Sequence, residues 1–140
     1  MATSRWQVNF IVAALGLAVA GAGAQEPRQG ASLGKQEYQA NCVPCHGASG
    51  RGEGPRAESL SRVPPDLTSY ARRNGGTMPN QHARATIDGR AFHDKYRPMP
   101  AWVEYYTEEA AALPDSAVPG GYVDTRLSAL VDYLATLQVQ

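Results

Sequence analysis

The chain has 140 residues with 13 basic and 13 acidic side chains, so its formal net charge is zero. This length suits one domain with one core. A neutral chain lacks the clustered cationic excess that nucleic-acid-binding proteins need. With only two cysteines, the chain has no set of disulfides of the kind that stabilises many small secreted domains. We therefore expect another group to complete the core.

The first 24 residues have the pattern of a signal peptide. Arg5 precedes a continuous apolar run over residues 10–20, and Ala22-Gly23-Ala24 provides the small residues that a signal peptidase requires. We predict cleavage after Ala24, which removes residues 1–24. The alternative is an uncleaved membrane anchor, but an apolar run of roughly a dozen residues is short for a span, which needs about 20. We therefore expect an exported protein with no stable membrane span after cleavage.

Short helices and long connections are predicted for the next part of the chain. Residues 25–32 form a polar lead-in, and Ser32 can cap a helix over 33–41. The stretch 47–65 is rich in Gly, Pro, Ser and Arg, and only a weak helical turn is expected at 56–60.

Two further helices are predicted in the second half. Asn80 can cap a helix over 80–88 that Gly89 terminates. Pro100 is suited to the first turn of another helix over 101–112.

The last helix has the clearest pattern. Asp124 is its expected cap, and apolar residues follow at i, i+3, i+4, i+7 and i+10, namely Leu127, Leu130, Val131, Leu134 and Leu137. This spacing places them on one face of an α-helix. No stretch alternates with the period of a strand over a useful length. The chain is therefore predicted to be all-α.

The segment Cys42-Val43-Pro44-Cys45-His46 is a haem attachment signature. Two thiols three residues apart in a helical turn can each add to one vinyl group of the porphyrin as a thioether. The imidazole of His46 then lies beneath the ring, where its nitrogen can bind the iron. We predict one haem c, covalently bound through Cys42 and Cys45.

Two other uses of the cysteines fit the sequence less well. A redox-active dithiol belongs near a βαβ pattern, and the sequence has none. A structural zinc site needs four ligands. Cys42, Cys45, His82 and His93 supply four donors, but no second paired spacing supports such a site.

The iron needs a ligand on its other face, and methionine sulfur suits electron transfer because it raises the potential. Met99 lies between two prolines in a rigid loop, and Trp102 follows closely enough to shield the iron. We predict Met99 as this ligand. Met78, His82 or His93, or a site without a second protein ligand, remain as alternatives.

The chain resembles the class I cytochrome c family over residues 33–138. In that family a glycine and an aromatic residue precede the first haem cysteine by eight and four residues, as Gly34 and Tyr38 do here. They pack against a terminal helix of Leu-x-x-Tyr type, which Leu130 and Tyr133 match. The resemblance implies a domain over 33–140 in which short helices surround one covalently bound haem and the N- and C-terminal helices cross.

Two further segments resemble periplasmic mono-haem members of this family. Pro64-Pro65-Asp66-Leu67-Thr68 matches a segment that runs along the haem edge near the propionates, so the resemblance implies that Pro65 contacts the haem. Met99-Pro100-Ala101-Trp102 matches the loop that delivers the axial methionine. Arg72 and Arg73 are candidates to neutralise the propionates, and a surface role is the alternative for each. The stretch 103–122 departs from the family pattern, and no role is assigned to it.

The predicted function is one-electron transfer, with no catalytic residues, because an iron with both axial positions filled has no place for a substrate. Charge is uneven: residues 51–97 hold nine basic and five acidic side chains, and residues 98–140 hold one and six. Such a split can orient a redox partner. The expected partners are a dehydrogenase, a terminal oxidase or both, with the chain as a free carrier or as a cytochrome subunit. The alternative is an open-site haem enzyme or gas sensor.

Overall fold

The computed structural model describes residues 29–90, 98–114 and 121–139. The predicted signal peptide over 1–24, the first half of the lead-in and the candidate ligand His93 lie outside the described residues. The described part of the chain is helical and contains no strand, which confirms the all-α prediction. No helix within these ranges is long and apolar enough to span a membrane.

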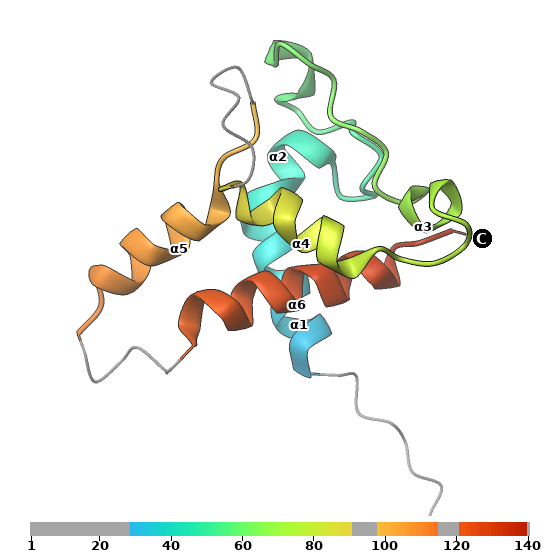
Figure 1. Ribbon diagram of the computed structural model, residues 1–140. Coiled ribbons are helices and arrows are strands. Elements are labelled where there is room, and N and C mark those ends of the chain that lie inside the picture. The colour runs from blue at the N-terminus through green and yellow to red at the C-terminus, as the bar shows by residue number, and fades with distance from the viewer. Residues whose placement is uncertain (1–28, 91–97, 115–120, 140) are drawn as a thin grey trace, which may run out of the picture.

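Eight helical elements follow one another along the described chain. They are α1 (Gln29–Glu37), the π-helical turn η1 (Tyr38–Cys42), α2 (Val43–His46), the 3₁₀ turn η2 (Ala57–Ser59), α3 (Tyr70–Arg73), α4 (Asn80–Asp88), α5 (Trp102–Ala111) and α6 (Tyr122–Thr136). In Figure 1, α6 lies across α1, with α4 and α5 beside it and the long 47–69 connection above.

The first helix differs from its prediction at both ends. It is already formed at Gln29, so Ser32 lies inside it and is not its N-cap. The predicted helix over 33–41 also changes at Tyr38 into the π-helical turn η1, which is followed directly by α2. A capping side chain alone does not fix where a helix begins. Single π turns often occur at functional sites, and this one ends at Cys42.

The crossing of α1 and α6 is confirmed and depends on Gly34. A Cβ on this residue would overlap the backbone carbonyl of Ala129, so only glycine lets the two backbones come this close. The rings of Tyr38 and Tyr133 pack beside this point, with centroids 5.3 Å apart. The N- and C-terminal helices therefore form the frame of the fold.

Helix α6 presents the predicted apolar face to the core. Leu127, Leu130, Val131 and Leu134 are buried, and Leu137 is partly buried against the same cluster. The predicted cap was wrong. The helix begins at Tyr122, and Gly121 precedes it, so Asp124 lies in its first turn, where its carboxylate pairs with Arg84 instead.

Helices α4 and α5 cover α6 and match their predictions closely. Gly89 ends α4 in the left-handed conformation, with φ of 86°, which glycine adopts at no steric cost. Asn80 is the first residue of α4 and makes no side-chain capping bond, so its predicted cap role was wrong; Pro79 precedes it. Helix α5 is one residue shorter at each end than predicted, because Ala101 is still extended and Ala112 is its C-cap.

Candidate functional site

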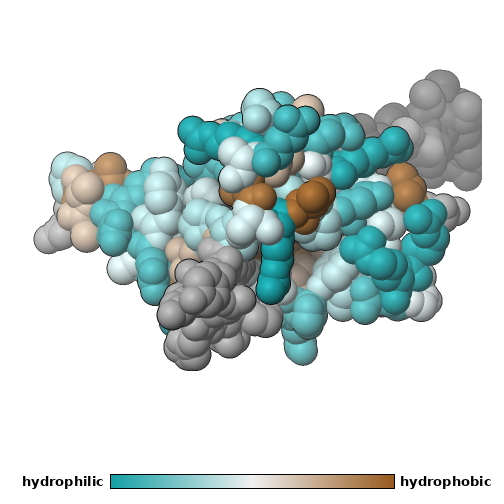
Figure 2. Space-filling model, turned by 90° about the horizontal axis from the view of Figure 1, so that it is seen from above, coloured by the Kyte–Doolittle hydropathy of each residue, from teal (hydrophilic) through white to brown (hydrophobic). Residues whose placement is uncertain are grey.

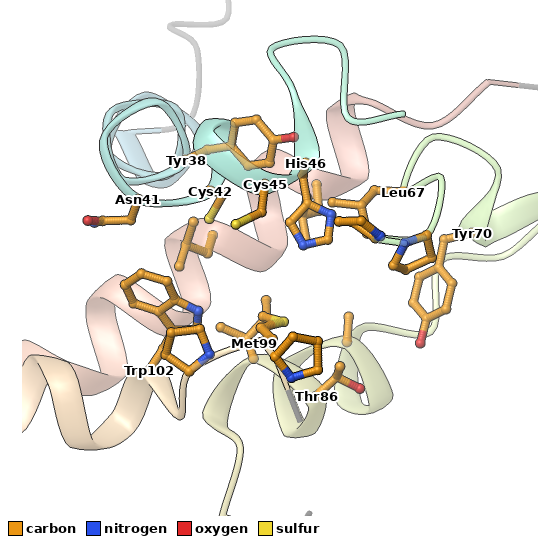
Figure 3. Close-up of a pocket in the computed structure, with 18 of the residues that line it drawn as sticks. Tyr38, Asn41, Cys42, Cys45, His46, Leu67, Tyr70, Thr86, Met99 and Trp102 are labelled. Carbon is orange, nitrogen blue, oxygen red and sulfur yellow. The ribbon is translucent and has the colours of Figure 1, made fainter. Parts of the chain in front are cut away.

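A cavity of about 440 Å³ lies between α2 and the 47–69 connection on one side and α4 and the start of α5 on the other. This volume lies within the range of cofactor sites in proteins. The side chains around it are mainly apolar, and α6 contributes Leu130 and Leu134 to its wall. Figure 3 shows an open space between two groups of side chains.

The two cysteines lie on the first wall of the cavity. Their thiols are free and half-buried, and their sulfur atoms face the cavity (Figure 3). Burial raises the pKa of the Cys42 thiol to about 12, and the neighbouring Cys45 contributes to the same shift. Redox-active dithiols instead have a lowered thiol pKa, so the environment of Cys42 argues against that alternative.

His46 is buried at the end of α2. Burial lowers the pKa of its imidazole, an effect that the backbone carbonyl of Pro65 partly opposes. This contact falls short of a hydrogen bond, since Nδ1 of His46 is buried without a partner among the described residues. The ring is therefore neutral near pH 7, which is the form that binds a metal.

The backbone around His46 is fixed by hydrogen bonds. The hydroxyl of Tyr38 donates to the carbonyl oxygen of Gly47 over 2.8 Å, and the amide of Gly52 donates to the carbonyl oxygen of His46 over 2.9 Å. These contacts join the end of α2 both to η1 and to the connection that follows. They set the direction in which the imidazole enters the cavity.

Met99 and Trp102 lie on the second wall. Met99 extends into the cavity from the side opposite His46 (Figure 3). Trp102 is buried, and its ring packs against those of Tyr105 and Tyr106, with centroid distances of 5.2 and 5.9 Å. The aromatic contacts hold the first turn of α5, and with it the short segment that follows Met99.

Met78 and His82 also line this cavity, next to the start of α4. Met78 is partly buried against the core, whereas His82 is largely exposed and its ring lies 6.2 Å from that of Tyr70. Among the described residues, no group of three or more His, Cys, Asp and Glu side chains can hold a metal ion. The fourth donor of the zinc alternative, His93, lies outside those residues.

The segment from 62 to 73 forms the rim of the cavity. Pro65 lines it, together with Arg62 and Arg73. Arg73 is held in place, because it donates to Ser69 and, over 3.0 Å, to the carbonyl oxygen of Asp66. Arg72 is exposed and does not line the cavity. Two guanidinium groups therefore lie at the rim, and only one of them was a predicted candidate.

An exposed apolar residue lies on the same rim. Val63 lines the cavity and is 81% exposed. Figure 2 views the molecule from the side of the 47–69 connection, and a small group of hydrophobic residues is exposed there among mainly hydrophilic ones.

The family model described as "Cytochrome c" matches residues 31–138. The chain belongs to the cytochrome c family. No curated protein and no solved structure matches it. Members of this family carry covalently bound haem c and typically act as electron carriers with redox partners, so this cytochrome is a haem-binding electron-transfer protein.

The cavity fits a haem attached in this way. Cys42 and Cys45 have the spacing for two thioether bonds, and both sulfur atoms face the cavity. The buried imidazole of His46 lines the same cavity and supplies a neutral nitrogen donor. The largely apolar walls suit the face of a porphyrin.

The sequence did not identify several cavity residues. Helix α4 places Ala83, Thr86 and Ile87 on the wall. Their spacing of three and four residues is the signal that would have found this face of the helix. Arg62 and Val63 lie in an irregular connection, where no periodic pattern indicates direction.

Proposed function

We propose that this cytochrome is an exported mono-haem electron carrier in which His46 and Met99 bind the two faces of the iron. One observation carries the proposal: His46 and Met99 extend from opposite walls into a single apolar cavity, and both motif thiols face the same space (Figure 3). Met78 and His82 also reach the cavity. Met99 is favoured because proline on either side makes its loop rigid and the buried Trp102 anchors the following helix.

The bound haem supplies an iron that accepts and releases one electron. The residues of the chain determine how easily it does so. Burial keeps His46 neutral and able to donate, and the thioether of Met99 favours the reduced state. Leu130, Leu134 and Trp102 keep water away from the cavity, which disfavours the additional positive charge of the oxidised state. Met99 also occupies the position that a substrate or gas would need, so electron transfer is favoured over catalysis.

The rim residues have distinct proposed roles. Pro65 lies against the haem edge, and Trp102 shields the side on which Met99 binds. Arg73 and Arg62 pair with the propionates, since they are the arginines of the described chain that line the cavity. Arg72, which is exposed and away from the cavity, is instead a surface residue.

The location and partners follow from the sequence pattern. Cleavage after Ala24 would release the domain over 33–140 into the periplasm. A dehydrogenase, a terminal oxidase or both would then exchange electrons with it, guided by the basic 51–97 region. The chain serves as a free carrier or as the cytochrome subunit of an oxidoreductase complex. Co-purification with a larger flavin- or molybdenum-containing chain would separate these two forms.

The ligand assignment is tested with Met99→Ala, using Met78→Ala and His82→Ala as matched controls from the same cavity. Only Met99→Ala should abolish the far-red sulfur–iron absorption of the oxidised protein, lower the reduction potential and allow the reduced protein to bind carbon monoxide at neutral pH. If the absorption survives in Met99→Ala and disappears in Met78→Ala, the assignment is wrong. If wild type itself binds carbon monoxide, the open-site alternative is correct.

A further inference from the structure

A partly buried polar cluster lies where α1, α5 and α6 meet, behind the wall of the cavity. We call it the Glu37 cluster, and it consists of Glu37, Asn41, Tyr106, Glu109, Tyr122 and Arg126. Glu37 is only 7% exposed and Tyr106 is fully buried. A carboxylate is rarely buried to this extent unless it is paired. The buried carboxylate of Glu37 must therefore be stabilised by the polar groups around it.

The carboxylate of Glu37 joins three elements. Its Oε2 accepts hydrogen bonds from the hydroxyl of Tyr106 in α5, over 2.8 Å, and from Nδ2 of Asn41 in η1, over 3.1 Å. Its Oε1 pairs with Nη1 of Arg126 in α6. These partners are 69, 4 and 89 residues away along the chain. One side chain thus connects both sides of the cavity to the C-terminal helix.

The charges of the cluster depend on one arginine. Arg126 pairs with Glu37, and its Nε lies 3.8 Å from Oε2 of Glu109. Its guanidinium also lies 4.3 Å from the ring centre of Tyr122 and 5.6 Å from that of Tyr106. Two carboxylates are therefore balanced by one guanidinium. Removing one partner of such a buried pair leaves the other charge without compensation.

The cluster is in direct contact with the cavity on both sides. Asn41, which donates to Glu37, lines the cavity and precedes Cys42. Tyr106 follows Trp102 by one helical turn, and their rings are in contact at 5.9 Å. Trp102 lines the cavity three residues after Met99. The hydrogen bonds of Glu37 therefore join the wall that carries the thiols to the wall that carries Met99.

We propose that Glu37 is a positioning residue for electron transfer: through Tyr106 it holds the Met99 wall against the thiol wall, and its pairing with Arg126 adjusts the reduction potential. This inference rests on the proposed role of Met99 as the iron ligand. Glu37 acts through other residues and does not touch the haem ligands. Both parts can be measured separately, since one concerns geometry and the other concerns charge.

The geometric part is tested with Tyr106→Phe, which removes one hydroxyl and keeps the buried ring. Tyr105→Phe is the matched control, because Tyr105 lies on the same helix but is 45% exposed. On heating the oxidised haem protein, Tyr106→Phe should lose its far-red sulfur–iron absorption well before its far-ultraviolet circular dichroism changes. Tyr105→Phe should behave as wild type does. If Tyr106→Phe and Tyr105→Phe lose the absorption at the same temperature, the positioning role is refuted.

The charge part is tested by potentiometry of Glu37→Gln and Arg126→Gln. Glu37→Gln removes a buried negative charge near the cavity, so the oxidised state becomes less favourable and the potential should rise. Arg126→Gln removes the positive partner, so the reduction potential should fall. Arg126→Lys keeps the positive charge, so its potential should lie close to that of wild type. Glu104→Gln is the control, because this exposed carboxylate is screened by solvent. Shifts of the same sign in Glu37→Gln and Arg126→Gln, or no shift in either, overturn the inference.

The two proposals fail in different ways. If Met99 is not the ligand, wild type lacks the far-red absorption before any substitution in the cluster is made. If the absorption is present in wild type and depends on Met99, yet is indifferent to Tyr106→Phe, then only the inference about Glu37 is wrong. Should Arg126→Gln fail to fold, Glu37→Gln and Tyr106→Phe still decide the outcome.

Discussion

Replacing Gly34 by alanine gives a stability change whose sign depends on the helix crossing. Within an isolated helix, alanine is more favourable than glycine by about 1 kcal/mol, so α1 alone predicts a gain. The crossing predicts a loss, because a Cβ here would overlap the carbonyl of Ala129 and lie 2.8 Å from the Cβ of Tyr133. Neither group is the end of a flexible side chain. The two helices must therefore move apart to accept even one methyl group.

The expected magnitude follows from this obstruction. Overpacking a core typically costs about 1 to 3 kcal/mol, and an obstruction by backbone belongs at or above the upper end. After the gain of about 1 kcal/mol in helix propensity is included, Gly34→Ala should destabilise the protein by about 2 to 3 kcal/mol. For a domain of this size, that corresponds to a fall of roughly 10 to 20 °C in Tm.

The measurement is denaturant unfolding of the haem-loaded protein, followed by far-ultraviolet circular dichroism. Ser32→Ala is the matched control, because Ser32 is exposed inside the same helix. It should be neutral or slightly stabilising, whereas a true N-cap would lose about 1 kcal/mol. A Gly34→Ala protein as stable as wild type would refute the close crossing of the two helices.

Three further predictions concern the cofactor, the C-terminus and acid stability. Replacing both motif cysteines by alanine should leave the chain largely unfolded, because it loses the porphyrin, whose burial contributes roughly 12 kcal/mol to the free energy of folding. Native helicity in circular dichroism would contradict this. Gln138→Ala should lower the free energy of unfolding by about 2 to 4 kcal/mol, because this side chain accepts a hydrogen bond from the amide of Ala71 and donates two, to the carbonyl oxygens of Leu67 and Leu134. Gln138→Glu should lose at least as much, because it places a carboxylate oxygen against these two carbonyl oxygens. Hydrogen bonds from Thr68 hold the pKa of Asp66 below its usual range, so its ionised form stabilises the fold above about pH 3.9 and this stabilisation is lost as the pH falls through the lower folded pKa. Asp66→Asn should therefore be less stable than wild type at pH 7, and the difference should vanish in acid; a difference independent of pH would show that its charge is irrelevant.

Local signals in the sequence were sufficient to predict α4, α5 and α6, but not the π-helical turn η1 or the short helix α3. The apolar face of α6 and the glycine that ends α4 are properties of a single segment, and the structure has both. The caps were predicted less well. Ser32 and Asp124 each have a suitable side chain, but α1 and α6 begin earlier, so both residues lie inside their helices. A capping side chain alone does not fix where a helix begins.

In the candidate site, too, some residues could be predicted from a local motif and others could not. Cys42, Cys45 and His46 belong to one pentapeptide whose spacing itself indicates the chemistry, and the structure places all three on one wall of the cavity. The pairing of Glu37 with Arg126 joins residues 89 positions apart. No local pattern indicates such a pair, because a single charged residue in a helical segment is expected to lie on the solvent-exposed face. Only the fold brings them together.

Helix α6 links the crossing to the cofactor cavity, and this explains why the cavity belongs to the core of the protein. Ala129 supplies the carbonyl that excludes a side chain at position 34, and the next residue, Leu130, lines the cavity. Both are almost completely buried. Consecutive residues of a helix point in directions about 100° apart, so one turn contacts α1 and the cavity at once. A group bound in the cavity adds apolar contacts to the Leu130 and Leu134 side of α6, on the same stretch of helix whose other side packs against Gly34. Attachment of the haem and closure of the helix crossing are therefore expected to stabilise each other.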